Sequence, residues 1–176
     1  MINQSAEELF PIVDAEGAVV GSATRAQCHG GSMLLHPVVH LHLFNSAGEL
    51  FLQHRPAWKD IQPNRWDSGV GGHVDYGESV EQALLRESRE ELSVESFTPQ
   101  FVCSYIFESE RERELVNVFT TCFDGDVRPT EECDGGRFWS EKEISESLGR
   151  GVFTPNFESE LREYLIPRGI IELSDV

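Results

Sequence analysis

The stretch Gly72–Leu92 constrains the fold of this chain most strongly, because a short glycine-containing loop leads there into a helix rich in carboxylates. Ser79 can cap this helix, and Gln82 stands three residues later, which is the spacing of a capping box. The helix is therefore expected to begin after Ser79 and to run to about Leu92. Just ahead of it, the glycines of Gly69–Gly72 allow the backbone to approach a metal or a phosphate closely.

Strand-like runs lie on both sides of this helix. His36–Phe44 alternates between an apolar face and a face that carries His36, His40 and His42. Further strands are expected at Leu9–Val13, Ala18–Ala23, Glu49–His54, Phe101–Phe107, Leu115–Phe123 and Arg137–Trp139. Shorter helices are expected after Ser140 and after Thr154, the latter ending near Ile166. Strands, a helix and then more strands and helices favour an α/β fold, a sandwich with a mixed sheet.

Three glutamates of the central helix, Glu87, Glu90 and Glu91, share one face, because residues three and four apart are neighbours on a helix. Like charges so placed disfavour the helix by about 0.2–0.5 kcal/mol per pair, and a divalent cation would reverse that sign. Mg²⁺ prefers such oxygen ligands, and Arg86 can pair with Glu90. A solvated acidic helix face is the alternative interpretation.

The fixed spacing favours the metal site. Gly72, Glu78, Arg86, Glu87, Glu90 and Glu91 fit the pattern G-x5-E-x7-R-E-x2-E-E. That pattern is the Nudix box, so the chain resembles the Nudix hydrolase family.

The resemblance implies an α/β/α sandwich in which the box forms a loop, a helix and a second loop. It implies that Glu87, Glu90 and Glu91 bind Mg²⁺ or Mn²⁺ and act in catalysis, with the carbonyl of Gly71 as a further ligand. Glu87 is alternatively the group that orients or deprotonates the water. Arg86, together with Glu78, would brace the box.

Two positions depart from the family pattern. Ser88 stands where an apolar residue is usual, and Ser93 where a glycine is usual. If Ser93 must adopt a left-handed backbone, it costs roughly 1 kcal/mol. Neither change removes a metal ligand.

The residues around the box are similar to those of type 1 isopentenyl diphosphate isomerases, which are Nudix relatives. The similarity rests on Phe44-Asn45, Leu50–Arg55, Trp66 and Gly72-His73. It implies a second divalent metal bound by His29, His36, His73, Glu112 and Glu114. The alternative is that His29 is a loop residue and that His36 serves packing or hydrogen bonding.

Gly71 separates this chain from those isomerases. They move protons on carbon and need a positioned acid/base pair, for which the family uses a cysteine directly before the Gly-His pair. Here that position is Gly71, so only Glu114 of the pair is present. A hydrolase that cleaves a diphosphate linkage, in a nucleoside diphosphate joined to another group, is the expected function. An isomerase-type enzyme and a non-catalytic nucleotide-binding module are the alternatives.

Candidate substrate contacts lie on the strand His36–Phe44 and in the loop that precedes the box. His40 and His42 can bond a phosphate or a base, Arg55 can bind phosphate, and Trp58 can stack on a base. Each has a plain alternative as a half-buried strand residue or a surface side chain. Outside the box, Glu108, Glu110, Glu131 and Glu132 are candidates for an additional base or ligand.

The composition limits the classes of molecule that this chain is expected to bind. The net charge of −17 disfavours nucleic acid polymers and anionic membranes, because both need a basic surface. No apolar run approaches the ~20 residues of a membrane span. At 176 residues, one domain over 1–176 is expected, with 1–30 as an N-terminal extension packed on it. Cys103 and Cys122 are expected as reduced core residues, in line with a cytoplasmic location. The expected binding partner is a small-molecule diphosphate, and the sequence is compatible with a monomer or a homodimer.

Overall fold

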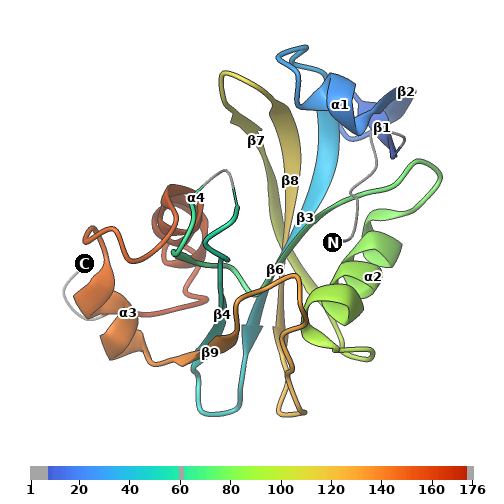
Figure 1. Ribbon diagram of the computed structural model, residues 1–176. Helices are drawn as coiled ribbons and strands as arrows, with labels where there is room; N and C mark the ends of the chain where they lie inside the picture. Colours follow the sequence, from blue (N-terminus) through green and yellow to red (C-terminus); the bar gives the residue numbers. More distant parts are fainter. Residues whose placement is uncertain (1–7, 60–61, 174–176) are drawn as a thin grey trace.

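A mixed seven-stranded sheet forms the centre of the computed structural model, which describes residues 8–59 and 62–173 (Figure 1). Its strands run in the order β5-β4-β3-β8-β7, with β6 paired to β3 and β9 paired to β4. The strands are β3 (Leu35–Phe44), β4 (Leu50–His54), β5 (Trp66–Asp67), β6 (Val70–His73), β7 (Gln100–Glu108), β8 (Arg113–Cys122) and β9 (Gly136–Trp139). Only β3 and β8 pair in parallel; the remaining pairs of this sheet are antiparallel. The expected α/β fold with a mixed sheet is confirmed.

Strand β3 is buried on both faces. Val39, Leu41 and Leu43 pack toward the long helix on one face and are fully buried. The opposite face carries Val38 and the histidines, of which His36 is fully buried as well. Because side chains alternate along a strand, the histidine face turns away from the long helix.

The long helix, α2 (Val80–Leu92), covers the first of these faces. Ser79 caps it in a capping box with Gln82, as expected. Ser93 ends it with a φ of 58°, in the left-handed region. Ser88 is buried, and its hydroxyl donates to the carbonyl of Leu84 at 2.7 Å, which satisfies a polar group at an apolar position.

Helices from the C-terminal part of the chain cover the other face, as Figure 1 shows. They are α3 (Glu141–Ser147), α4 (Pro155–Glu160) and η1 (Leu161–Leu165). The third helix was expected to be a single α-helix; its second half is instead the π-helical turn η1. Phe157, Leu161 and Leu165 are buried against the sheet in spite of this change.

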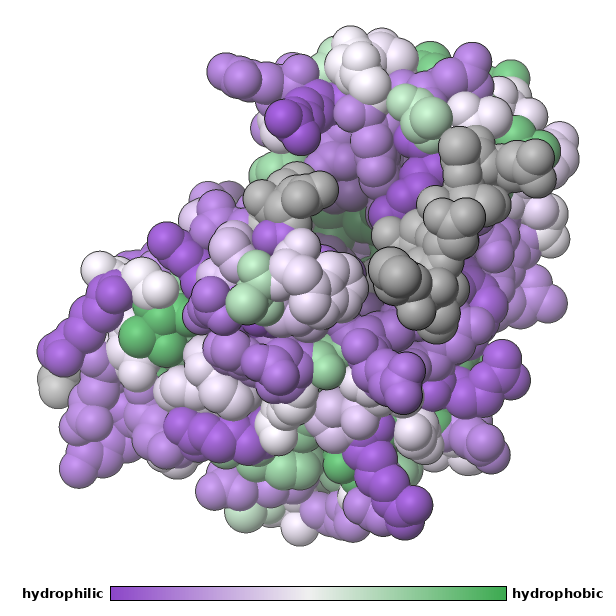
Figure 2. Space-filling view, viewed as in Figure 1, coloured by the Kyte–Doolittle hydropathy of each residue, from purple (hydrophilic) through white to green (hydrophobic). Residues whose placement is uncertain are grey.

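A separate hairpin lies at the N-terminal end, formed by β1 (Leu9–Val13) and β2 (Val19–Thr24) and followed by the short helix α1 (Arg25–Cys28). Phe10 anchors it, stacked on His73 with the ring centroids 4.5 Å apart. Residues 1–7 of the expected extension lie outside the described residues. Figure 2 shows a hollow over the central strands, between this hairpin and the side that carries α4.

Two further expectations concern the surface. Cys122 is exposed at the end of β8, so its expected place in the core is wrong, while Cys103 is half-buried. Over residues 8–59 and 62–173, the structure contains no helix with the length and apolar character to cross a bilayer.

Candidate active site and metal centre

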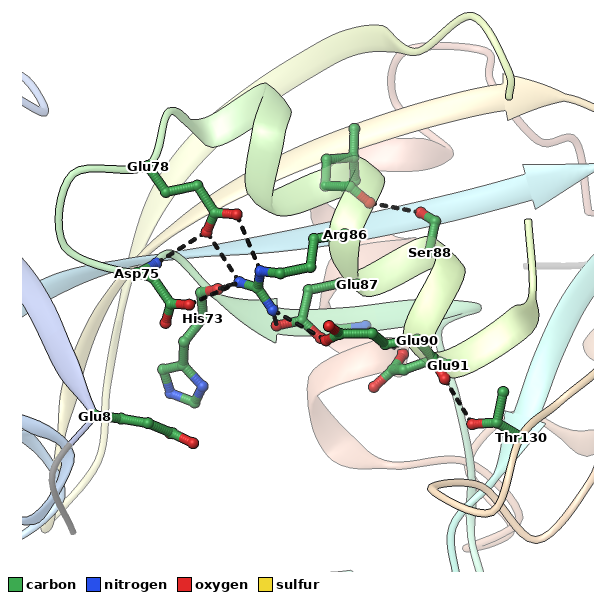
Figure 3. A network of polar contacts seen from close by, with 12 residues as sticks. Glu8, His73, Asp75, Glu78, Arg86, Glu87, Ser88, Glu90, Glu91 and Thr130 are labelled. Carbon is green, nitrogen blue, oxygen red and sulfur yellow. Dashed lines mark hydrogen bonds and ion pairs between the residues drawn. The ribbon is translucent and has the colours of Figure 1, made fainter. Parts of the chain in front are cut away.

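Arg86 is the centre of a polar network on α2 (Figure 3). Its Nε and Nη2 donate to the two oxygens of Glu78, both at 2.9 Å, and Nη2 also donates to the carbonyl of His73 at 2.9 Å. Its Nη1 donates to Glu87 at 2.7 Å and to Glu90 at 3.2 Å. The carboxylates of Glu78 and Glu87 raise the pKa of Arg86. Arg86 therefore ties the loop before α2 to the helix and holds Glu87 beside Glu90.

Glu91 is held from the sheet side of the same cluster. Its Oε2 accepts from the backbone N–H of Gly71 at 3.2 Å and from Nε2 of Gln53 at 3.0 Å. Burial, together with the charge of Glu87, raises the pKa of Glu91 to about 8. Burial raises the pKa of Glu87 to about 7, in spite of Arg86. Carboxylates whose charged forms are disfavoured by burial and by each other gain most from a divalent cation.

Gly72 makes this packing possible. A Cβ placed on Gly72 would lie 2.1 Å from Cδ of Glu87, well inside van der Waals contact. The carboxylate of Glu87 therefore occupies the space of a missing side chain on β6. At Gly71 the structure gives a contact for the backbone N–H, and the role of its carbonyl as a metal ligand stays a prediction.

The five residues of the expected second metal site converge. Nε2 of His29 lies 3.1 Å from Nε2 of His73 and 3.4 Å from Oε2 of Glu112. Oε1 of Glu114 lies 3.8 Å from Nε2 of His73 and 4.0 Å from Nε2 of His36. Nitrogens of the three histidines lie within 4.8 Å of one another, and so do ligand atoms of His36, Glu112 and Glu114. Chain segments separated by more than forty residues thus meet at one point.

His36 shows that this cluster suits a metal ion. Its Nδ1 lies 3.0 Å from the carbonyl of Leu34, which fixes the proton there and leaves a lone pair on Nε2. That Nε2 is buried and has no hydrogen-bond partner among the residues that the structure describes. A buried polar atom without a partner is costly, and a neutral imidazole nitrogen is a metal ligand.

The electrostatics of the cluster agree with this geometry. Burial lowers the pKa of His29 to about 4, with Arg25 and His36 adding to the effect, and it lowers the pKa of His73 as well. Burial and the neighbouring Glu112 raise the pKa of Glu114 to about 7. Neutral histidines beside crowded carboxylates form a donor set for a divalent ion.

The two other histidines of β3 are bonded to a glutamate that the sequence did not single out. Glu160 on α4 accepts from Nδ1 of His40 at 3.0 Å, from Nε2 of His42 at 2.6 Å and from the hydroxyl of Tyr105 at 2.7 Å. His42 is fully buried, so the expectation that it contacts substrate is wrong. The ring of His40 reaches the surface; burial opposes its charge, yet Glu160 raises the pKa of His40 to about 9.

The other substrate candidates lie around the box. Nη1 of Arg55 lies 3.4 Å from Oδ2 of Asp67. Burial and the charges of Glu91 and Glu132 raise the pKa of Cys133 to about 12, and Arg55 opposes them. Arg55 therefore lies beside β5, the strand that precedes β6 along the chain.

Trp58 lies at the surface with its side chain well exposed, and Nζ of Lys59 stands 5.0 Å from its ring centroid. Glu108, a further candidate base, is paired with Arg113 at 3.3 Å. Substrate contacts by Arg55, Trp58 and His40 stay predictions.

Comparisons with known proteins agree with these features. The NUDIX domain family profile matches residues 34–157. An uncharacterized Nudix hydrolase of Streptomyces coelicolor is 33% identical over 155 residues, covering 86% of this chain and 85% of that protein. An isopentenyl-diphosphate Delta-isomerase of Mycolicibacterium vanbaalenii is 38% identical over 87 residues, covering 49% of this chain and 48% of that protein. The crystal structure of DR0079 from Deinococcus radiodurans superposes with a TM-score of 0.74 at 26% identity, covering 88% of this chain and 98% of that one.

The profile spans most of the chain, and the Streptomyces relative is similar over most of its own length. Similarity to the isomerase is limited to about half of each chain. This chain belongs to the Nudix hydrolase family and resembles its isopentenyl diphosphate isomerase-like members.

Proposed function

We propose that this protein is a metal-dependent hydrolase that cleaves a diphosphate linkage in a nucleoside diphosphate joined to another group. The observation that carries the proposal is the position of Glu87, Glu90 and Glu91. Arg86 holds the first two side by side, and Gly71 and Gln53 hold Glu91 against them.

These carboxylates fit Mg²⁺ or Mn²⁺, since three carboxylates lie together, Glu87 and Glu91 are partly buried, and Arg86 is the cation that bonds to Glu87 and Glu90. When bound, such an ion neutralises charge on the diphosphate and makes a bound water more acidic. The chain's own residues then orient the reactants. Arg86 fixes the carboxylate of Glu87, and Glu91 is aimed by its two hydrogen bonds from the sheet.

Proton transfer is the second task of this cluster. The oxygen of water attacks one phosphorus, the bond from that phosphorus to the bridging oxygen breaks, and two phosphorylated products leave. The water proton needs an acceptor whose pKa lies near neutrality. Glu87 is the candidate acceptor, because Arg86 holds its carboxylate beside Glu90, and Glu132 is a second candidate base.

The cluster of His29, His36, His73, Glu112 and Glu114 fits a second divalent metal, on the evidence of the unpartnered Nε2 of His36. Nitrogen and oxygen donors in this mixture suit Zn²⁺, Mn²⁺ or Mg²⁺. Isomerase chemistry is not proposed, because Gly71 has no side chain that can move a proton and Glu114 would act alone.

Turnover tests the catalytic proposal. Purified protein with Mg²⁺ or Mn²⁺ is assayed against nucleotide sugars, dinucleotides and nucleoside di- and triphosphates. Glu91→Gln should lower kcat roughly 100-fold or more, because it removes a charge opposite the ion. The matched control is Glu95→Gln, an exposed glutamate just beyond α2, which should keep wild-type turnover. Equal kcat in both variants contradicts the catalytic assignment, and binding without cleavage across the panel favours a nucleotide-binding module.

Metal analysis tests the second site. Native mass spectrometry after loading with Mn²⁺ or Zn²⁺ should show one ion fewer in His29→Gln than in wild type. His54→Gln, on β4 and paired with Asp134 at 3.2 Å, is the control and should keep the full number. An unchanged count in His29→Gln would show that the histidine cluster binds no ion.

A further inference from the structure

The carboxylate of Glu160 is a buried acceptor between the sheet and α4. It is 1% exposed and takes three hydrogen bonds, from His40, His42 and Tyr105. Each of these donors is a side chain of β3 or β7, so one residue of α4 gathers polar groups from two strands. Three donors on two oxygens are the environment of an ionised carboxylate.

A buried negative charge needs a compensating cation. Among residues 8–59 and 62–173, the partners of Glu160 that can carry a positive charge are the two imidazoles. Nδ1 of His42 is buried without a hydrogen-bond partner in the described part of the chain, so a second proton there would be an unsatisfied donor. His40 is 18% exposed, so its second nitrogen can meet solvent or a ligand. Hydrogen-bond accounting therefore assigns the positive charge to His40, with a proton on Nε2.

That Nε2 lies beside Gly71 of β6. A Cβ placed on Gly71 would lie 3.8 Å from Nε2 of His40 and 3.6 Å from its Cδ2, which are ordinary contact distances. The missing side chain of Gly71 thus leaves space beside the free edge of the His40 ring. The N–H of the same Gly71 donates to Glu91, so one residue of β6 contacts a box carboxylate through its backbone and His40 through the space of its missing side chain.

We propose that His40 is a substrate-binding residue whose Nε2–H donates to a terminal phosphate oxygen, and that Glu160 is the positioning residue that orients its ring. The inference rests on the proposed function and names a substrate class within it, in which the group joined to the nucleoside diphosphate is itself a phosphate. An imidazolium N–H bonds most strongly to the most highly charged oxygens of a ligand. The space beside Gly71, where the resemblance places a cysteine in the isomerases, would take that phosphate.

Binding of methylenediphosphonate, which has two terminal phosphonates and no bridging oxygen to cleave, tests the contact directly. Calorimetry with Mg²⁺-loaded protein should give about 10- to 100-fold weaker binding for His40→Gln, the loss of one charge-assisted hydrogen bond. His54→Gln is the matched control, since it removes a half-buried, carboxylate-paired imidazole elsewhere on the sheet, and its Kd should stay within about twofold of wild type. An unchanged Kd in His40→Gln, or equal losses in both variants, overturns the proposal.

A second readout concerns the positioning role. The ¹⁵N chemical shifts of the His40 ring should be those of an imidazolium in wild type and of a neutral ring in Glu160→Gln, a change that loss of packing alone would not produce. A neutral His40 in the wild-type protein overturns the assignment. If Glu160→Gln does not fold, the wild-type spectrum still tests the charge of His40, and the calorimetric titration of His40→Gln still tests its contact with the phosphonate.

Catalytic assays separate this inference from the proposed function. For a nucleoside triphosphate, kcat/KM should fall about 10- to 100-fold in His40→Gln, and for a nucleotide sugar it should change less than about threefold. If wild type cleaves nothing but binds methylenediphosphonate through His40, the hydrolase proposal fails and the subsite stands. If Glu91→Gln abolishes cleavage while His40→Gln behaves as wild type, the subsite alone fails.

Discussion

Two adjacent glycines of β6 have opposite surroundings, although they look equivalent in the sequence. Gly72 faces α2, where a Cβ would collide with Glu87 at 2.1 Å from Cδ. Gly71 faces the other side of the sheet, where a Cβ would meet His40 at 3.6 Å. The alternation of a strand explains the difference. Glycine is therefore required at position 72 by the carboxylate of Glu87, whereas position 71 has room for a Cβ.

Alanine at each position should separate these roles. Gly72→Ala should displace the carboxylate of Glu87 and lower kcat about 100-fold, because small shifts of reacting groups are costly. The side chain of Glu87 can swing away, so the free energy of unfolding should change by only about 1 kcal/mol. Gly71→Ala is the matched control: it should fold and bind metal as wild type does. The kcat, the affinity for Mn²⁺ and the thermal unfolding of both variants are measured. A wild-type kcat in Gly72→Ala would contradict the packing argument.

At the scale of residues, the spacing of the motif predicted the carboxylate cluster on α2, and the resemblance to the isomerases predicted the histidine cluster. Neither the spacing nor the resemblance predicted Glu160, because its bonds to His40 and His42 span 120 and 118 residues. No local periodicity encodes a contact over such a separation. The expectation for His42 was wrong for the same reason, since its buried partner comes from the far end of the chain.

At the scale of elements, α2 was predictable because its signals are local. The capping box of Ser79 and Gln82 is encoded within four residues. The π-helical turn of η1 was not predictable, since its five residues look like ordinary helix formers. The four-residue helix α1 was missed too, as an element too short to show a period.

Ser93 gives a stability prediction for α2. It ends the helix at a φ of 58°, and an L-residue in the left-handed region costs roughly 1 kcal/mol relative to glycine. Ser93→Gly should therefore raise the free energy of unfolding by about 0.5–1 kcal/mol. Ser147→Gly, within the last turn of α3, should lower it, because glycine disfavours a helix. Denaturant unfolding checks both signs, and a loss of stability in Ser93→Gly would refute the argument.

At the scale of the whole molecule, the excess of negative charge determines how stability responds to metal ions and to pH. The chain carries a net charge of −17, and several of its carboxylates lie together in two buried clusters. Cations bound there would stabilise the folded state, because the unfolded chain does not gather these ligands. Stability should therefore depend on metal and pH together.

The sign of that dependence follows from three raised pKa values. Burial raises the pKa of Glu87 and Glu114 to about 7 and that of Glu91 to about 8, above the unfolded value near 4.3. Raising the pH through about 7 to 8 removes protons that only the folded protein held, so the metal-free protein should lose stability. The raised pKa of His40, about 9, acts in the same direction. Histidines with lowered pKa values contribute nothing there, since they are neutral in both states above about pH 7.

Thermal unfolding with and without Mg²⁺ measures this coupling. The rise in Tm on adding Mg²⁺ should be larger at pH 8 than at pH 6.5, because deprotonated carboxylates bind the ion. Glu91→Gln should reduce that difference. A rise that is equal at both pH values, or larger at the lower one, would contradict the assignment of these groups.

Strand β3 sets a limit on how this protein can evolve. Its apolar face meets α2, and its histidine face carries His36 of the candidate metal cluster and His40 of the proposed phosphate subsite. Inserting or deleting one residue near its start would exchange the two faces, burying imidazoles against α2 and removing both sites at once. Single substitutions at Gly71 leave that register intact. Descendants of such a chain can therefore change their chemistry by point mutation in β6, while the length of β3 stays fixed.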